Sequence, residues 1–224
     1  MVLRGPERLP ASGGPAKQLV VLCHGVGADG NDLIGLADYW AQVLPDAQFV
    51  APDGPEPYDM APSGFGGRQW FSIGDLDPAT LGDGVRRAQI ALDAFIDMEI
   101  VRLGIREHGY ALMGFSQGAM TVLFTGLRRK IPPRAILAYS GALIDPESLA
   151  PEVTGKPPVL LVHGENDAVV PSFRSRAAAT ALMAEGVPVQ TLCVPGLGHG
   201  IEQEGLKAGA DTLRQAFECH DQKE

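Results

Sequence analysis

Short runs of apolar residues recur along the chain and predict buried β-strands. Most of these runs are rich in Val, Leu and Ile and are apolar throughout, with no alternation of apolar and polar positions. Unbroken apolar runs of this length are typical of strands that are covered on both faces. The predicted strands lie at residues 19–23, 48–51, 110–113, 135–139, 159–162 and 189–194.

Segments with helical periodicity lie between the predicted strands. In residues 85–103, apolar side chains recur on one stripe, and Gly104 follows as a stop signal. The stripe consists of Val85, Ala88, Leu92, Phe95 and Ile96. Further helices are predicted at residues 31–44, 119–127, 172–185 and 201–219. Strands that alternate with helices predict a mostly parallel sheet with helices on both faces, an α/β fold.

The length of 224 residues is enough for one domain with a substantial core. No internal repeat and no shift in composition marks a second domain. We therefore expect residues 1–224 to form a single domain, with residues 1–16 as an N-terminal extension.

Residues 52–81 interrupt the alternation of strands and helices. This segment contains several Pro and Gly residues together with aromatic side chains, including Trp70 and Phe71. A connection this long in a compact domain is usually functional or disordered, and the aromatic content argues against disorder. We expect a loop that covers a site and supplies apolar walls. The alternative is that Trp70 and Phe71 only anchor the loop to the core.

The charge and cysteine content exclude several classes of function. A net charge of −9 argues against a nucleic-acid-binding surface, which needs clustered Lys and Arg. The three cysteines (Cys23, Cys193 and Cys219) form no C-x-x-C pair, so we expect neither disulfides nor a metal site. They are expected to be small buried hydrophobic residues in a reducing compartment.

No apolar stretch approaches 18 residues, and the first ten residues contain no signal-peptide core. The sequence therefore predicts a cytoplasmic protein without stable membrane insertion.

Residues 114–118 read Gly-Phe-Ser-Gln-Gly, a G-x-S-x-G motif between the predicted strand 110–113 and the predicted helix 119–127. This context is that of a nucleophile elbow, a sharp and strained strand-to-helix turn that exposes the serine hydroxyl. Ser116 is the predicted nucleophile.

A serine nucleophile needs a base and an acid that orients the base. In α/β hydrolases these residues follow in the order Ser, acid, His. Asp167 comes just after the predicted strand 159–162, and the carboxyl ends of parallel strands face the crevice where ligands bind. Asp145 is a rival acid, although Asp followed by Pro often only opens a turn.

His199 is the predicted base. It lies between two glycines after the predicted strand 189–194, and a free histidine titrates at a pKa of ~6.5, which suits a general base. His24 and His163 each follow a strand and precede Gly, so we expect them to pack or form hydrogen bonds beneath the site.

The oxyanion hole is expected to combine two backbone N–H groups. Gln117, directly after the serine, supplies the first at a helix N-terminus. Val26, in the loop after the predicted strand 19–23, is the choice for the second.

The same loop also matches the dinucleotide-binding pattern G-x-G-x-x-G, with an acidic residue, Asp53, 23 positions after Gly30. Asp29 and Asp32 would oppose the charge of a pyrophosphate there. Dinucleotide binding would also leave the ordered Ser, Asp and His unexplained.

Taken together, these motifs resemble the phospholipase/carboxylesterase family of small α/β hydrolases, which includes the acyl-protein thioesterases. The resemblance runs from about residue 19 to the last helix and rests on residues 24–30, 68–71, 114–118, 163–167 and 198–199. It implies an α/β-hydrolase fold, a triad of Ser116, Asp167 and His199, and oxyanion donors at Val26 and Gln117. It also implies an acyl groove bordered by Trp70, with Phe71 beside it.

The family cleaves carboxylic esters of short to medium acyl chains, and some members cleave thioesters or lysophospholipids. The resemblance thus implies a small-molecule or lipid acyl ester as substrate and no metal or cofactor, and it allows a homodimer. One position departs from the family, because Ser72 follows Trp-Phe where Asp is common. A binding protein without catalysis on the same fold is the alternative from another class.

Overall fold

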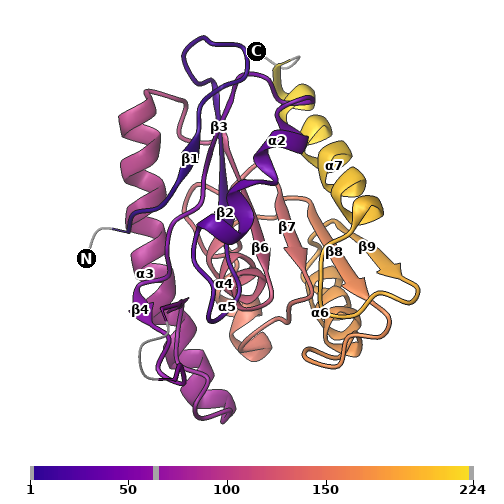
Figure 1. Cartoon of the computed structure of the whole chain (residues 1–224). Helices are drawn as coiled ribbons and strands as arrows, with labels where there is room; N and C mark the ends of the chain where they lie inside the picture. Colours follow the sequence, from indigo (N-terminus) through magenta and orange to yellow (C-terminus); the bar gives the residue numbers. More distant parts are fainter. Residues whose placement is uncertain (1–2, 63–65, 222–224) are drawn as a thin grey trace.

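The computed structural model describes residues 3–62 and 66–221. A seven-stranded sheet forms the centre, with strand order β1-β3-β2-β6-β7-β8-β9 (Figure 1). All pairs are parallel except β1 with β3. The strands are β1 (Glu7–Arg8), β2 (Gln18–Cys23), β3 (Ala47–Val50), β6 (Tyr110–Phe115), β7 (Ile136–Tyr139), β8 (Val159–Gly164) and β9 (Val189–Val194). All six strands expected from the apolar runs are present.

Helices cover both faces of this sheet, which confirms the predicted α/β class (Figure 1). Helices α3, α4 and α6 pack on one face, and α1, α2 and α7 pack on the other. They are α1 (Asn31–Ile34), α2 (Ala37–Trp40), α3 (Pro78–Leu103), α4 (Gln117–Gly126), α5 (Leu149–Glu152), α6 (Phe173–Ala184) and α7 (Gln203–Asp221), with a 3₁₀ turn, η1, at Pro146–Ser148.

Strand β2 shows why an unbroken apolar run is needed. Leu19, Val21 and Cys23 face the core under α3 and α4, whereas Val20 and Leu22 face the core under α1, α2 and α7. Side chains alternate across a strand, so both sets are buried only when both faces are covered. All five are fully buried.

The single helix predicted at residues 31–44 is wrong. The structure has two short helices, α1 and α2, separated at Gly35 and Leu36. The N–H of Leu36 donates to the Leu33 carbonyl and that of Asp38 to the Gly35 carbonyl, three residues back in each case. These tight bonds interrupt the ladder of an α-helix.

Helix α3 begins seven residues before the predicted start at Val85. Asp77 caps it, since its carboxylate accepts from the N–H groups of Ala79 and Thr80. Pro78 occupies the first turn, where a missing N–H costs nothing.

The rest of the 52–81 segment holds a small hairpin of β4 (Glu56–Pro57) and β5 (Arg68–Gln69). Residues 63–65 of the predicted loop lie outside the described residues.

The cysteine prediction is correct for one residue and wrong for another. Cys23 is buried in β2, but Cys193 is exposed because β9 is the last strand of the sheet. The side chain of Cys219 lies outside the described part of the chain. None of the described helices is long and apolar enough to cross a membrane.

Candidate active site

Ser116 lies at the turn between β6 and α4, in a backbone conformation that is rare for a residue with a side chain. Its φ is 54° and its ψ is −117°. Strain of this kind persists only where the surroundings fix the backbone, and it is typical of functional turns. Here the Ser116 N–H donates to the Tyr139 carbonyl at 2.9 Å, and Ser116 is buried.

The three side chains expected to act together lie in hydrogen-bond contact. His199 Nε2 lies 3.0 Å from Ser116 Oγ, and His199 Nδ1 lies 2.7 Å from Asp167 Oδ2. Asp167 follows β8 and His199 follows β9, so three strand ends supply the group. The carboxylate can only accept, so it fixes the proton on Nδ1 and leaves Nε2 free to accept the serine proton.

The Asp167 carboxylate is buried and held by its own turn. Its Oδ1 accepts from the N–H groups of Val169 and Val170, each at 2.9 Å. Burial alone would raise the pKa of Asp167, but the hydrogen bonds from His199 and these two N–H groups outweigh it and hold the pKa below its usual value. The group therefore stays ionised beside His199.

The rival acid Asp145 is not near the base. Its Oδ2 accepts instead from Arg86 of α3 at 2.8 Å. The structure brings Asp167, and not Asp145, to the imidazole.

Close backbone packing joins the two loops that carry Asp167 and His199. A Cβ on Gly164, at the end of β8, would lie 2.3 Å from the Gly198 carbonyl oxygen. The N–H of Asn166 donates to the Leu197 carbonyl at 2.9 Å. Only glycine permits this approach, so Gly164 at the end of β8 is required for the geometry of the site.

The two predicted oxyanion donors belong to the residue after Ser116 and to the loop that packs against it. Gln117 is the first residue of α4, so its N–H has no acceptor within the helix. In the loop after β2, the N–H of Gly27 donates to the Arg68 carbonyl and the N–H of Ala28 donates to the Gly25 carbonyl. Among the residues that the structure describes, the N–H of Val26 has no such backbone acceptor and is therefore the candidate donor to an oxyanion. The neighbouring Gly25 is close to the serine, because a Cβ there would lie 3.4 Å from Ser116 Cβ.

The last glycine of the G-x-G-x-x-G pattern in this loop forms a hydrogen bond within the protein. Asp53 Oδ1 accepts from the Gly30 N–H at 2.9 Å, across the ends of β2 and β3. The helix that follows, α1, has four residues. The acidic residue therefore holds the loop in place and is not left for a ribose.

Trp70 and Phe71 do not border an open groove, which corrects the expected substrate contacts. They are 0% and 1% exposed and belong to the core under α3 and α4. Trp70 Nε1 donates to the His24 carbonyl at 3.0 Å. The alternative reading, an anchor for the loop, describes these contacts.

The side chain of Gln117 has a function that the sequence did not reveal. Its Oε1 accepts from the Trp70 N–H at 2.8 Å, and its Nε2 donates to the Phe71 carbonyl at 2.7 Å. One amide thus clamps the 52–81 segment onto the start of α4. A buried Gln next to the serine was the available signal, because a buried amide needs partners for both of its ends.

His24 and His163 form hydrogen bonds beneath the site, as predicted. His24 Nδ1 donates to the Gly25 carbonyl at 2.7 Å, and His24 Nε2 accepts from the Gly54 N–H at 2.8 Å. His163 contacts Ser175, Val170 and Asp167.

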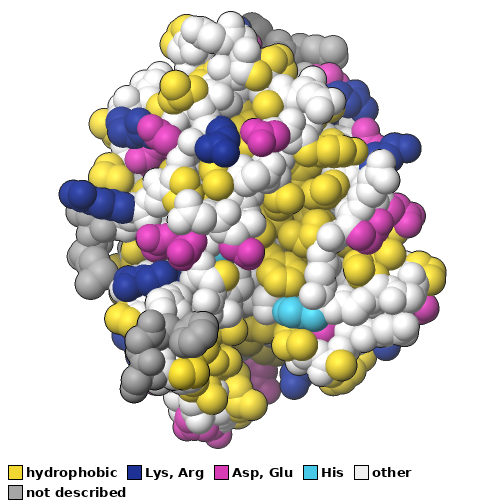
Figure 2. Space-filling model, viewed as in Figure 1, with side chains coloured by type: hydrophobic (Ala, Val, Ile, Leu, Met, Phe, Trp, Pro, Cys, Tyr) yellow, Lys and Arg dark blue, Asp and Glu magenta, His cyan; other side chains and the backbone are white. Residues whose placement is uncertain are grey.

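Apolar surface adjoins the serine and the histidine. The ring of Phe115 lies 4.8 Å from that of His199, centroid to centroid. Phe115 and Ile201 are partly exposed and pack against the core under α1, α2 and α7. Figure 2 shows a strip of apolar side chains between these helices, with a histidine at its lower end.

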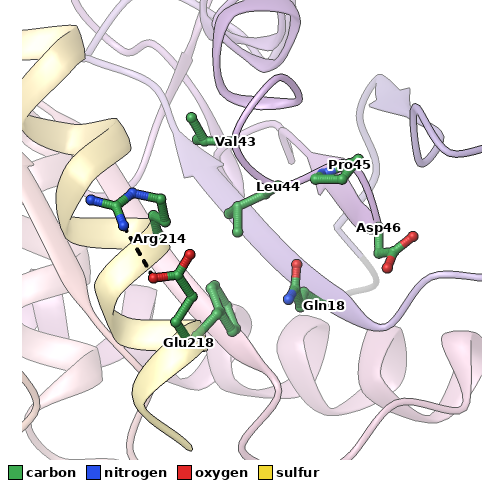
Figure 3. Close-up of a pocket in the computed structure, with 8 residues that line it drawn as sticks. Gln18, Val43, Leu44, Pro45, Asp46, Arg214 and Glu218 are labelled. Atoms are coloured by element: carbon green, nitrogen blue, oxygen red, sulfur yellow. Dashed lines mark hydrogen bonds and ion pairs between the residues drawn. The ribbon is translucent and has the colours of Figure 1, made fainter. Parts of the chain in front are cut away.

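A small cavity lies at the opposite end of β2 from this site (Figure 3). Its volume is about 100 Å³, and its lining includes Gln18, Leu44 and Arg214. Gln18 begins β2, whereas the loop beside Ser116 follows Cys23 at the end of the strand. Within residues 3–62 and 66–221 no group of three His, Cys, Asp or Glu side chains could hold a metal ion.

A family model and several known proteins match most of this chain. The family described as Phospholipase/Carboxylesterase matches residues 7–216. Esterase YpfH of Escherichia coli is 31% identical over 98% of this chain and 89% of its own. Acyl-protein thioesterase 1 of Gibberella zeae is 29% identical over 88% of this chain and 89% of its own. The crystal structure of esterase PE8 superposes with a TM-score of 0.90 at 40% identity, over 96% of this chain and 100% of that one.

Proposed function

The chain belongs to the phospholipase/carboxylesterase family and is a hydrolase of ester bonds, and from this premise we propose that Ser116, His199 and Asp167 are its catalytic triad. The observation that carries the proposal is the pair of contacts of His199, at 3.0 Å to the serine and 2.7 Å to the aspartate. The expected substrates are carboxylic esters of short to medium acyl chains.

The reaction follows from these contacts. Ser116 Oγ attacks the acyl carbonyl while His199 Nε2 takes the hydroxyl proton. The N–H groups of Val26 and Gln117 donate to the oxyanion, each worth roughly 3–4 kcal/mol of barrier. The imidazolium returns its proton to the leaving alcohol as the C–O bond breaks, which leaves an acyl-enzyme. Water then attacks the acyl carbonyl while His199 takes one of its protons, and His199 returns that proton to Ser116 Oγ as the acid leaves.

The acyl chain is expected on the apolar surface formed by Phe115 and Ile201, and not against Trp70. Phe115 directly precedes the serine, Ile201 lies two positions after the histidine, and both are partly exposed, whereas Trp70 is fully buried. Burying a methylene is worth about 0.8 kcal/mol, so this surface should determine how kcat/KM depends on the length of the acyl chain.

The second candidate substrate is an acyl thioester or a lysophospholipid. Curated relatives of the chain include acyl-protein thioesterases, and the same residues can attack either acyl donor. A panel of p-nitrophenyl esters, acyl thioesters and lysolipids, compared by kcat/KM, distinguishes these classes. The cytoplasmic location stays a prediction of the sequence, and the family resemblance still allows a homodimer.

The deciding experiment replaces the nucleophile. Ser116→Ala should lower p-nitrophenyl butyrate turnover by about 10³-fold or more and abolish labelling by a fluorophosphonate probe. Ser12→Ala, in an exposed turn, is the matched control and should retain both. Near-normal turnover or labelling of folded Ser116→Ala protein would overturn the assignment.

A further inference from the structure

His163 is a second buried histidine in contact with the carboxylate of Asp167. It lies near the end of β8 and is 3% exposed. Its Nε2 lies 2.7 Å from the Val170 carbonyl oxygen and 3.2 Å from Asp167 Oδ2. Its Nδ1 lies 2.6 Å from Ser175 Oγ, on α6. Both ring nitrogens therefore have partners inside the protein.

These partners determine which nitrogen carries the proton. Nε2 faces two oxygens that can only accept, the Val170 carbonyl and the Asp167 carboxylate, so it must be the donor. Nδ1 then accepts from the Ser175 hydroxyl. With the opposite tautomer, a lone pair on Nε2 would face both oxygens, and the partly buried Val170 carbonyl would lose this donor.

Val170 links His163 to the triad. Its carbonyl accepts from His163 Nε2, and its N–H donates to Asp167 Oδ1 at 2.9 Å. One oxygen of the carboxylate is thus held through Val170, while the other contacts both His199 and His163. The imidazole of His163 therefore limits both rotation and displacement of the carboxylate.

We propose that His163 and Ser175 are positioning residues of the hydrolase, which hold the Asp167 carboxylate in the orientation that aligns His199 with Ser116. The inference rests on the proposed triad and adds two residues to it. Neither residue touches the reacting atoms, and each acts through Asp167. A misplacement of about 1 Å in such a group can cost on the order of 10²-fold in rate.

The test measures kcat and KM for p-nitrophenyl butyrate between pH 5 and 9 in the full-length protein. Ser175→Ala should lower kcat by about 10-fold, with KM within about twofold. His163→Leu, which removes the Nε2 donor, should lose about 100-fold. Both should also lower the midpoint of the acid limb, because a loosened carboxylate stabilises the imidazolium of His199 less.

His163→Gln is the conservative variant, since its amide N–H can replace the Nε2 donor, and it should recover most of the kcat lost in His163→Leu. Thr212→Ala is the matched control for Ser175→Ala, because it also removes a buried helical hydroxyl, one that donates to the Ala208 carbonyl on α7. It should leave kcat and the pH midpoint unchanged.

A double-mutant cycle separates positioning from general stability. In an Asp167→Ala background, His163→Leu should cost no further activity, because the group it positions is gone. If folded Ser175→Ala and His163→Leu proteins keep kcat and the pH midpoint of the wild type, or if His163→Leu costs the same in both backgrounds, the proposal is overturned. This outcome can be distinguished from failure of the proposed triad, because Ser116→Ala would still be inactive if only the positioning proposal were wrong.

Discussion

Gly118 lies so close to Cys23 that a Cβ on the glycine would come within 1.9 Å of the Cys23 carbonyl oxygen. This close approach packs the start of α4 against the end of β2 and so fixes the position of the helix N-terminus next to Ser116. Backbone atoms cannot retreat as the end of a flexible side chain can, so any side chain at this position must displace the helix or the strand.

Gly118→Ala should therefore destabilise the protein by about 3 kcal/mol or more and remove esterase activity, as measured by urea unfolding and ester turnover. Gly35→Ala is the control, because no atom lies within 4 Å of its added Cβ and its φ of −62° suits any residue. That variant should be unchanged or more stable by about 0.5–1 kcal/mol. Equal midpoints for the two variants would contradict this account of α4.

Trp70→Ala tests the corrected role of the buried indole. Truncation should cost about 3–5 kcal/mol of folding stability, since the side chain is fully enclosed and donates to the His24 carbonyl. At a temperature where the variant stays folded, kcat/KM should fall by the same factor for acetate, butyrate and octanoate esters.

Ile201→Ala is the matched comparison for Trp70→Ala. It should lower kcat/KM for octanoate more than for acetate, because Ile201 belongs to the partly exposed apolar surface proposed to hold the acyl chain. A selective loss on long esters in Trp70→Ala, and none in Ile201→Ala, would return the acyl chain to Trp70.

The sequence was sufficient to predict the candidate site residues that follow the ends of strands. The apolar runs located β6, β8 and β9, and the residues that follow them are the ones that meet: Ser116, Asp167 and His199. Parallel strands bring their carboxyl ends to one edge, so order along the chain predicted proximity in space.

The sequence was insufficient where a residue's position depends on distant partners. The backbone of Trp70 is held by an amide 47 positions away, that of Gln117, and the sequence does not identify that amide's partner. Cys193 lies in an apolar run, yet it is exposed because its strand is at the edge of the sheet, a property of the strand order. The break between α1 and α2 arises from tight bonds at Gly35, and a glycine within a helical pattern is often tolerated.

Glu152 should make the stability of the fold depend on pH. Burial alone would raise the pKa of Glu152, but hydrogen bonds from Arg128 and Arg86 outweigh it and hold the pKa below its usual value. Arg128 is itself buried, and its Nε donates to Glu152 at 2.6 Å. An acid with a lowered pKa in the folded state stabilises above the unfolded pKa, and this contribution is lost as pH falls through the folded value.

Glu152→Gln should therefore lower the free energy of unfolding by about 1–3 kcal/mol at pH 7. The gap to the wild type should close below about pH 4, where the unfolded carboxyl is protonated. Glu147→Gln, at an exposed position of η1, should change stability by less than about 0.5 kcal/mol at either pH. Thermal unfolding at both pH values measures this, and a gap that widens on acidification would contradict the ion-pair account.

The pH dependence of activity should report the imidazole and not the carboxylate. Because the pKa of Asp167 is held below its usual value, this group stays ionised as pH falls from 8 to 5. Histidine changes charge in about this range, and only the neutral imidazole can take the serine proton. For the wild type, kcat/KM should therefore rise with pH as a single ionisation, and a flat profile between pH 5 and 8 would contradict a histidine base.

Asp167→Asn should lower kcat by about 10⁴-fold while the fold is retained. The Asn amide donates where the carboxylate accepts, so it favours the tautomer that places the imidazole proton on Nε2, facing Ser116 Oγ at 3.0 Å. Asp145→Asn is the control, because Asp145 pairs with Arg86, and it should keep its kcat. A small loss in Asp167→Asn, combined with a large one in Asp145→Asn, would exchange the two carboxylates in the proposed triad.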